Sequence, residues 1–294
     1  MQSVEEIISK VKKIEIKTLK LVNEVFGGEY HSVFKGQGIE FSEVRPYQFG
    51  DDSRFIDWKV TARQNYPYVK VFQETRELNV LIVFDSSYST FFSGIDEKRE
   101  IGGEIAGILT FSALKNNDKT GLILFSDGVE KYIPLDKGKK HSLNIVRQIL
   151  SYKAKRGATN FSKTLEEINS FLKRKTIVFI ISDFLINEDD DEFERGLKIL
   201  SKKHDVVGIR IADRFELKPK VKGILPLKDI ETGDVLFLGK KALKEYEASV
   251  KKAENRIKNA FIHSKADFLE IRTGEDYFPI ILKFFKMRER RRIR

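Results

Sequence analysis

The chain has 294 residues, 41% hydrophobic and 33% charged, which is enough apolar surface for one large core and a smaller appended unit. Its formal net charge of +10 favours acidic partners but does not choose between nucleic acid, anionic lipid and protein. The absence of cysteine excludes disulfides, thiolate nucleophiles and cysteine-based metal sites. No apolar run approaches the roughly 18 residues that span a bilayer, so we expect a folded, cytoplasmic protein.

The first predicted element is an amphipathic helix over residues 4–26. Apolar residues recur there at helical spacing, with Lys and Glu between them, and Gly27 and Gly28 follow. Such a stripe suits either a membrane surface or the body of the protein, and we favour docking on the body. We assign residues 1–28 to this N-terminal segment.

Residues 29–76 form a block of different character. The stretch from Tyr30 to Gln64 has no sustained period and many turn residues, so we expect loops with short strands. The segment YVKVFQET, from Tyr68, alternates like a half-exposed strand. We expect a small β-rich subdomain here, completed by a hairpin around ETGD within residues 213–239.

From residue 77 onward, strand patterns alternate with helix patterns. NVLIVFD and TIVFIISDF are apolar runs suited to buried parallel strands, and TGLILFS, EKYIPL, DVVGIRIA and DFLEIRT predict further strands. Helical patterns fall at 99–116, 140–152, 161–174, 191–203, 240–264 and from 276 onward. The alternation predicts an α/β fold with a doubly wound, mostly parallel sheet over residues 77–212 and 240–294.

Polar residues follow two of these strands directly. NVLIVF leads into DSSYS, TIVFII leads into SDF, and KRGATN forms a turn before a helix; together they supply Asp85, Ser87, Ser89, Thr159 and Asp183. Ligands of open α/β sheets bind beyond the carboxyl ends of the strands. Carboxylate and hydroxyl oxygens suit Mg²⁺, with Mn²⁺ and Ca²⁺ as alternatives, and neutral hydroxyls leave the dication able to attract an acidic residue of a partner. The competing interpretation is that these residues only cap helices.

The order Asp-x-Ser-x-Ser, then Thr, then Asp resembles the metal-ion-dependent adhesion site of von Willebrand factor A domains. The resemblance implies hydroxyl ligands from Ser87, Ser89 and Thr159, carboxylates from Asp85 and Asp183, and a sixth position filled by a partner's carboxylate. Many such domains have Gly after the second aspartate, whereas this chain has Phe184.

The preceding block narrows the resemblance. GIEFSEVRPYQFGDDSRFIDWKVTARQNYPYVKVFQETRELNVLIVFDSS is similar to the hallmark of the domain of unknown function fifty-eight family, and ISDF, DRFE and DIETGD resemble further words of it. The likeness covers roughly residues 30 to 294. It implies a non-enzymatic protein-interaction module of von Willebrand factor A type. The implied partners are a MoxR-type AAA+ ATPase, which the module would serve as adaptor or co-chaperone, and a client protein bearing an acidic residue.

Charged side chains in this block surround the chain's only tryptophan. We interpret them as a structural ion-pair network or, second, as a partner-docking face; the residues are Arg45, Asp51, Asp52, Arg54, Asp57, Trp58 and Arg63. The alternative function is a metal-dependent hydrolase or nuclease, using either the same cation or the cluster of Asp57 and Lys59. That alternative needs another acidic residue and a general base, which the sequence does not identify.

The last stretch, MRERRRIR, would suit the phosphates of nucleic acid or anionic lipid. Arginines at a helix C-terminus also complement the helix dipole, and we favour this solvated helix end. We therefore predict no nucleic-acid partner. Contact with a membrane surface, without spanning it, is the weaker alternative.

Overall fold

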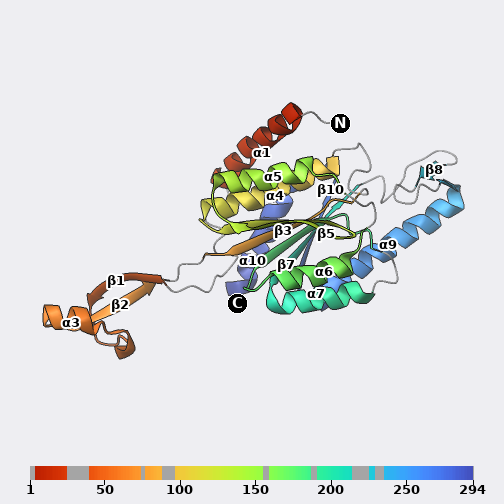
Figure 1. The fold of residues 1–294 in the computed structure, drawn as a ribbon. Helices are drawn as coiled ribbons and strands as arrows, with labels where there is room; N and C mark the ends of the chain where they lie inside the picture. The colour runs from red at the N-terminus through yellow and green to blue at the C-terminus, as the bar shows by residue number, and fades with distance from the viewer. Residues whose placement is uncertain are drawn as a thin grey trace. The chain divides into compact units, whose positions relative to one another are not determined.

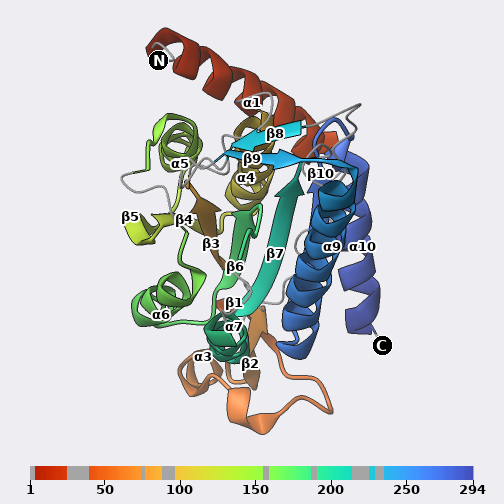
Figure 2. The same cartoon turned by 90° about the vertical axis from the view of Figure 1, so that its right-hand side faces the viewer.

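The computed structural model describes residues 4–24, 40–73, 77–87, 97–154, 159–186, 191–213, 225–228 and 235–293. Two compact units divide the chain: residues 34–78 form the smaller unit, and residues 1–33 together with 79–294 form the larger one. Figures 1 and 2 label most elements of both.

A six-stranded sheet in the order β10-β7-β6-β3-β4-β5 forms the centre of the larger unit. Its strands are β3 (Asn79–Asp85), β4 (Lys119–Ser126), β5 (Gly128–Asp136), β6 (Ile177–Ser182), β7 (Asp205–Ala212) and β10 (Asp267–Arg272). The edge strand β5 runs antiparallel to β4, and the other neighbours are parallel. The predicted doubly wound, mostly parallel α/β sheet is therefore confirmed. Its order reverses between β3 and β6, which makes that point the crevice where such sheets bind ligands.

Helices cover both faces of this sheet (Figures 1 and 2). One face carries α4 (Glu97–Lys115) and α5 (Lys139–Ser151), with α1 (Val4–Glu24) outside them. The other face carries α6 (Phe161–Phe171), α7 (Asp191–Lys203) and α9 (Lys240–His263). The last helix, α10 (Tyr277–Ile293), packs beside β10.

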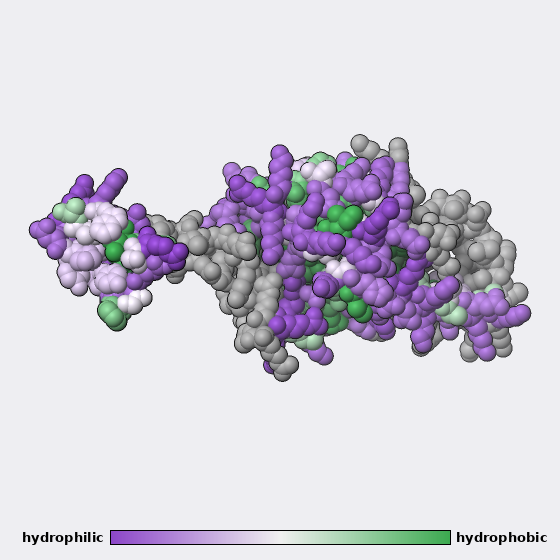
Figure 3. Space-filling model, turned by 90° about the horizontal axis from the view of Figure 1, so that it is seen from below, coloured by the Kyte–Doolittle hydropathy of each residue, from purple (hydrophilic) through white to green (hydrophobic). Residues whose placement is uncertain are grey.

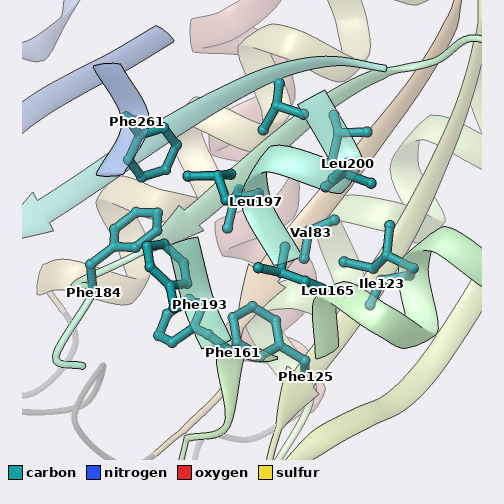
Figure 4. Close-up of a cluster of buried hydrophobic side chains, with 14 of the residues drawn as sticks. Val83, Ile123, Phe125, Phe161, Leu165, Phe184, Phe193, Leu197, Leu200 and Phe261 are labelled. Atoms are coloured by element: carbon teal, nitrogen blue, oxygen red, sulfur yellow. The ribbon is translucent and has the colours of Figure 1, made fainter. Parts of the chain in front are cut away.

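The face under α6, α7 and α9 holds a cluster of buried aromatic rings (Figure 4). Phe161 stacks on Phe184 with ring centroids 5.4 Å apart, and Phe193 and Phe261 meet the same pair edge-on. In β7, Gly208 is required by this packing, because a Cβ atom there would lie 2.3 Å from Cζ of Phe261. The cluster ties the sheet to α9.

The N-terminal helix docks on the body of the larger unit, as the sequence predicts. Its apolar stripe buries Ile14, Thr18 and Val22. Gly107 of α4 makes room for the stripe, since a Cβ atom there would lie 2.8 Å from Cγ2 of Ile14. The polar flank adds an ion pair of 2.7 Å between Lys17 and Glu104. Gly27 and Gly28 lie outside the described residues.

The smaller unit is a two-stranded antiparallel sheet with two short helical pieces. Strand β1 (Glu40–Pro46) pairs with β2 (Tyr68–Gln73), and η1 (Ser53–Phe55) and α3 (Trp58–Gln64) lie between them in sequence. The predicted β2 is confirmed, but the loops expected up to Gln64 include the unpredicted helix α3. This helix has only seven residues and none of them is buried, so it leaves no apolar periodicity in the sequence.

The predicted hairpin is present as β8 (Leu225–Lys228) and β9 (Val235–Leu238), which pair antiparallel. We expected residues 213–239 to complete the small β-rich subdomain, and the structure differs. Among the described strands, β8 and β9 form a sheet of their own, and their segment belongs to the larger unit. The backbone hydrogen-bonding groups of β8 and β9 pair with each other, and the two strands lie close in the sequence.

The face drawn in Figure 3 is mostly hydrophilic over the larger unit, in keeping with the high charged content. None of the helices in the described ranges has the length and apolar character needed to cross a bilayer.

Candidate metal site

The side chain of Asp85 is buried at the carboxyl end of β3 and fixed by two hydrogen bonds. Its Oδ1 accepts from the backbone N–H of Ser87 at 2.9 Å, and its Oδ2 accepts from the hydroxyl of Ser182 at 2.6 Å. The carboxylate is therefore held in one orientation by its own loop and by the neighbouring strand β6.

The second carboxylate, Asp183, directly follows β6 and is also buried. Since β3 and β6 pair through Phe84 and Ile181, the two acids lie at adjacent strand ends, on either side of the switch point. Burial raises the pKa of Asp85 to about 7, and the charge of Asp183 adds to this shift, while hydrogen bonds from Ser182 and Ser87 oppose it. Two carboxylates buried this close favour a cation between them.

A cation of the chain itself lies against these acids. Lys98, in the first turn of α4, is 2% exposed, and its Nζ lies 3.4 Å from Oδ2 of Asp183. A cavity of about 10 Å³ is bounded on its polar side by Asp85, Lys98, Ser182 and Asp183, and it is about large enough for one water or one ion. Sequence reasoning missed Lys98, because its partner lies 85 residues away and the chain has 54 Lys and Arg residues.

The two serines directly after Asp85 contact different parts of the structure. The hydroxyl of Ser86 donates to the backbone carbonyl of Phe125 at 2.8 Å and so ties the loop to β4. Ser87 is buried beside Asp85, where its hydroxyl is within reach of the same carboxylate. Ser89 lies outside the described residues. Ser182 was not among the predicted site residues, although it is the first residue of the SDF motif that supplied Asp183.

Thr159 reaches the same edge of the sheet from another element. It is half-buried and directly precedes Asn160, whose backbone N–H donates to the carbonyl of Ser126 at the end of β4 at 2.9 Å. The side chain of Asn160 is the N-cap of α6, accepting from the backbone N–H of Lys163 at 3.0 Å. Capping of this helix therefore falls to Asn160, and Thr159 is not needed for it.

Phe184 follows Asp183 in the left-handed backbone region, with φ of +52°. This conformation costs a non-glycine residue of order 1–3 kcal/mol, which explains the preference for Gly that the resemblance implies. The ring is 1% exposed within the aromatic cluster of Figure 4, and burying a Phe side chain contributes roughly 1.5–3 kcal/mol. The backbone N–H of Phe184 also donates to the hydroxyl of Ser182 at 2.8 Å. Packing and this hydrogen bond together hold the loop.

The backbone of Asp183 is held from the opposite side by Arg210 of β7. Its Nε donates to the carbonyl of Asp183 at 3.1 Å, and its Nη1 lies 3.0 Å from Oε1 of Glu254 in α9. Sequence reasoning missed Arg210 as well. The available signal was a single arginine inside the otherwise apolar run VVGIRIA.

These groups fit a hard divalent cation. The chain offers two buried carboxylates with the hydroxyl of Ser87 beside them, and Thr159 at the same edge of the sheet, all oxygen donors. In the part of the chain that the structure describes, no three His, Cys, Asp or Glu side chains cluster as metal ligands. A cation here would therefore depend on hydroxyl groups as well as on Asp85 and Asp183.

The charged block of the smaller unit is a set of local surface contacts. Arg45 forms a bidentate pair with Asp51, at 2.7 and 2.8 Å, and Arg54 lies 2.6 Å from Asp52. The contacts with Arg45 and Arg54 lower the pKa of Asp51 and bring that of Asp52 to about 2. The side chains of Arg54 and Asp52 are 84% and 37% exposed, so this is a surface pair.

The remaining members of the predicted network are less connected. None of the ion pairs in the described ranges includes Arg63, and Trp58 is 70% exposed. Asp57 is the N-cap of α3, accepting from the backbone N–H groups of Lys59 and Val60 at 3.0 and 3.2 Å, and these bonds lower its pKa. The carboxylate that the nuclease alternative requires therefore serves a helix terminus.

Two arginines of the C-terminal stretch make ion pairs within the fold. Arg288 is buried and lies 2.6 Å from Asp205 and 3.1 Å from Asp267, which also pairs with Arg291 at 3.0 Å. We expected a solvated helix end. The helix instead attaches to the amino ends of β7 and β10 through these pairs.

Comparison with known proteins gives relatives along nearly the whole chain. The uncharacterized protein Rv1480 of Mycobacterium tuberculosis (strain ATCC 25618 / H37Rv) is 27% identical over 292 residues, covering 97% of this chain and 90% of the relative. The uncharacterized protein YeaD of Bacillus subtilis (strain 168) is 34% identical over 109 residues, covering 37% of this chain and 25% of the relative.

Solved structures give more distant likenesses. They include the conserved hypothetical protein BatB from Bacteroides thetaiotaomicron (13% identity, 72% of this chain and 99% of that chain, TM-score 0.45). A von Willebrand factor type A protein from Catenulispora acidiphila matches at 12% identity, over 76% of this chain and 44% of that chain, with a TM-score of 0.39. Proximal thread matrix protein 1 from the mussel byssus, with a zinc-occupied MIDAS motif, matches at 18% identity over 72% and 47%, with a TM-score of 0.41.

The family model described as "Protein of unknown function DUF58" matches residues 43–256. This range includes most of β1, the charged block, Asp85, Thr159, Asp183 and much of α9. The chain therefore belongs to the DUF58 family.

Proposed function

We propose that this protein is a non-enzymatic protein-interaction module that binds a divalent cation at the carboxyl edge of its large sheet. The cation would be held by Asp85 and Asp183 with the hydroxyls of Ser87, Ser89 and Thr159. It would then attract an acidic residue of a partner protein. Mg²⁺ is our first choice, with Mn²⁺ and Ca²⁺ as alternatives.

The single observation that carries this proposal is the pair of buried carboxylates at the ends of β3 and β6. Asp85 and Asp183 lie where the strand order reverses, and the burial that raises the pKa of Asp85 makes an unneutralised pair unfavourable. A dication stabilises such a pair, and neutral hydroxyl ligands leave positive charge for an incoming carboxylate. Among the described residues, both acids at this edge, Asp85 and Asp183, are assigned to the cation, which favours binding over hydrolysis.

We further propose that the partner machinery is a MoxR-type AAA+ ATPase, which the module serves as adaptor or co-chaperone. The support is the resemblance of the charged block and the ISDF, DRFE and DIETGD words to the family. In this arrangement the acidic residue belongs to the client protein, and the ATPase supplies the work.

The test is capture of the ATPase and its clients by the immobilised full chain, in Mg²⁺ and in chelator. We expect capture in Mg²⁺, loss in chelator, and loss with Asp85→Ala. Asp136→Ala is the matched control, because Asp136 pairs with Thr120 at the amino end of β4, away from the site. Capture that ignores both chelator and Asp85→Ala would remove the mechanism, and Mg²⁺-dependent turnover of a phosphoester would replace it with the hydrolase alternative.

A further inference from the structure

The buried ammonium of Lys98 needs an explanation that the proposed metal site does not supply. A lysine at 2% exposure is rare, because removing its charge from water is costly unless a partner compensates. The compensating group is Asp183, itself 3% exposed, with its Oδ2 3.4 Å from Nζ of Lys98. The chain therefore places one positive charge directly on one of the two carboxylates assigned to the cation.

Lys98 also shares space with that cation. The polar side of the cavity of about 10 Å³ is formed by Asp85, Ser182, Asp183 and Lys98 together. A cavity of this size has room for about one small ion or water, so an ion that contacts both carboxylates lies within reach of the ammonium. The ammonium and the dication compete for the same oxygens.

The charge count points the same way. In formal charges, two carboxylates and one ammonium leave the metal-free site at −1. Adding a dication to all three gives +1, with the carboxylates already neutralised by the dication and the ammonium left as a like charge beside it. Like charges in a site of low dielectric repel strongly, and this repulsion falls when the longer, flexible side chain turns away. Lysine suits this exchange, since its charge sits at the end of a flexible four-carbon stem.

We propose that Lys98 is a built-in competitor of the divalent cation, which neutralises Asp183 in the metal-free protein and is displaced when the dication binds. The inference rests on the proposed function and adds its regulation. Competition from Lys98 makes the affinity for the metal lower than the oxygen ligands alone would give. The site therefore binds the divalent cation only when its free concentration is high. Metal-free protein is also spared the repulsion between its two carboxylates.

The test is calorimetric titration of the full chain with Mg²⁺ and with Mn²⁺, without any partner. Lys98→Met removes the charge and keeps the length of the side chain, and we expect it to bind the metal about tenfold or more tightly than the unmodified protein. Lys98→Arg retains the charge and should gain nothing. Lys198→Met is the matched control for net charge, because Lys198 pairs with Glu194 on the exposed surface of α7.

A second measurement covers the case in which Lys98→Met folds poorly. Lys98→Gln keeps a hydrogen-bond donor and removes the charge, and Mg²⁺ should raise its melting temperature more than it raises that of the unmodified protein. Equal affinities and equal shifts in all variants would overturn the role of Lys98 and leave the proposed metal site standing. No binding of Mg²⁺ or Mn²⁺ to any variant would overturn both.

Discussion

The carboxyl edge of the large sheet and the charged block of the smaller unit contain the same kinds of residue, and the protein uses them differently. At the edge, Asp85, Asp183 and Lys98 are buried, and Asp183 acts on both of the others across long sequence separations. In the block, Arg54 and Asp52 lie two residues apart and stay exposed. Burial therefore decides which charges are coupled strongly enough to bind an ion, and exposure leaves the others as surface contacts.

The largest expected effect tests whether the edge depends on packing. Phe184→Ala should lower the free energy of unfolding by about 3–5 kcal/mol, because it removes a buried ring. Substitution by Gly is ordinarily more destabilising than substitution by Ala. Here, Phe184→Gly should be at least as stable as Phe184→Ala, because Gly adopts a φ of +52° without strain. Urea unfolding of both variants measures this difference.

Phe171→Ala is the control for this experiment, because Phe171 stacks on Tyr132 but is 41% exposed, and its loss should be much smaller. If Phe184→Gly were clearly less stable than Phe184→Ala, the backbone at this position would not be strained. If the Phe171 and Phe184 variants lost equal stability, burial would not separate the edge from the surface.

A smaller effect is expected on the pH dependence of stability, which should differ between the two units. Burial, with a smaller effect of Lys203, lowers the pKa of His204 from its ordinary value of 6.5. The neutral imidazole is favoured in the folded state, so its stabilisation is complete above pH 6.5 and is lost as the pH falls through the lowered pKa. The unmodified protein should therefore lose stability below pH 6.5 relative to His204→Gln. Thermal unfolding of both proteins across pH measures the difference.

The half-buried carboxylates Asp51 and Asp57 of the smaller unit should affect stability at a lower pH than His204 does. Asp51 and Asp57 have a lowered pKa, so their stabilisation is present above the ordinary value of 3.8 and is lost only as the pH falls through the lower folded values. Parallel stability curves for the unmodified protein and His204→Gln would show that His204 is not held neutral. If the smaller unit lost its structure near pH 6, the predicted difference in pH dependence between the two units would be wrong.

The smallest expected effect lies in the smaller unit. Asp57→Ala removes the N-cap of α3, and amide hydrogen exchange in this helix should become roughly fivefold faster. Exchange in the large sheet and binding of Mg²⁺ should not change. Asp52→Asn is the matched variant, and it should leave α3 unaffected because Asp52 caps η1 instead. Loss of metal binding in Asp57→Ala would revive the nuclease alternative.

Much of the fold is visible in the sequence, for a physical reason. Strands buried on both faces, such as β3 and β6, leave continuous apolar runs, and the helices between them keep a helical period. The placement of Asp85 and Asp183 follows from the same pattern, because parallel strands bring their carboxyl ends to one edge. Helix α3 escaped prediction since it buries no residue and so has no apolar face.

The charged partners of the site could not be predicted in this way. Lys98 meets Asp183 across 85 residues, and Arg210 meets the same residue across 27. Nothing in local sequence distinguishes Lys98 from the other lysines of the chain, because its burial depends on how α4 lies over the sheet. Asn160 is an intermediate case, since a cap is predictable in type, but the structure is needed to separate it from its neighbour Thr159.

The docking of α1 also sets an order of events during synthesis. The partner of Lys17 is Glu104, 87 residues further along the chain. At roughly 5–20 residues per second, the ribosome needs about 4 to 17 s to supply it. For that time the stripe that contains Ile14 and Val22 has no covering helix. The nascent chain therefore exposes an apolar helical surface to chaperones and membranes that the finished protein conceals.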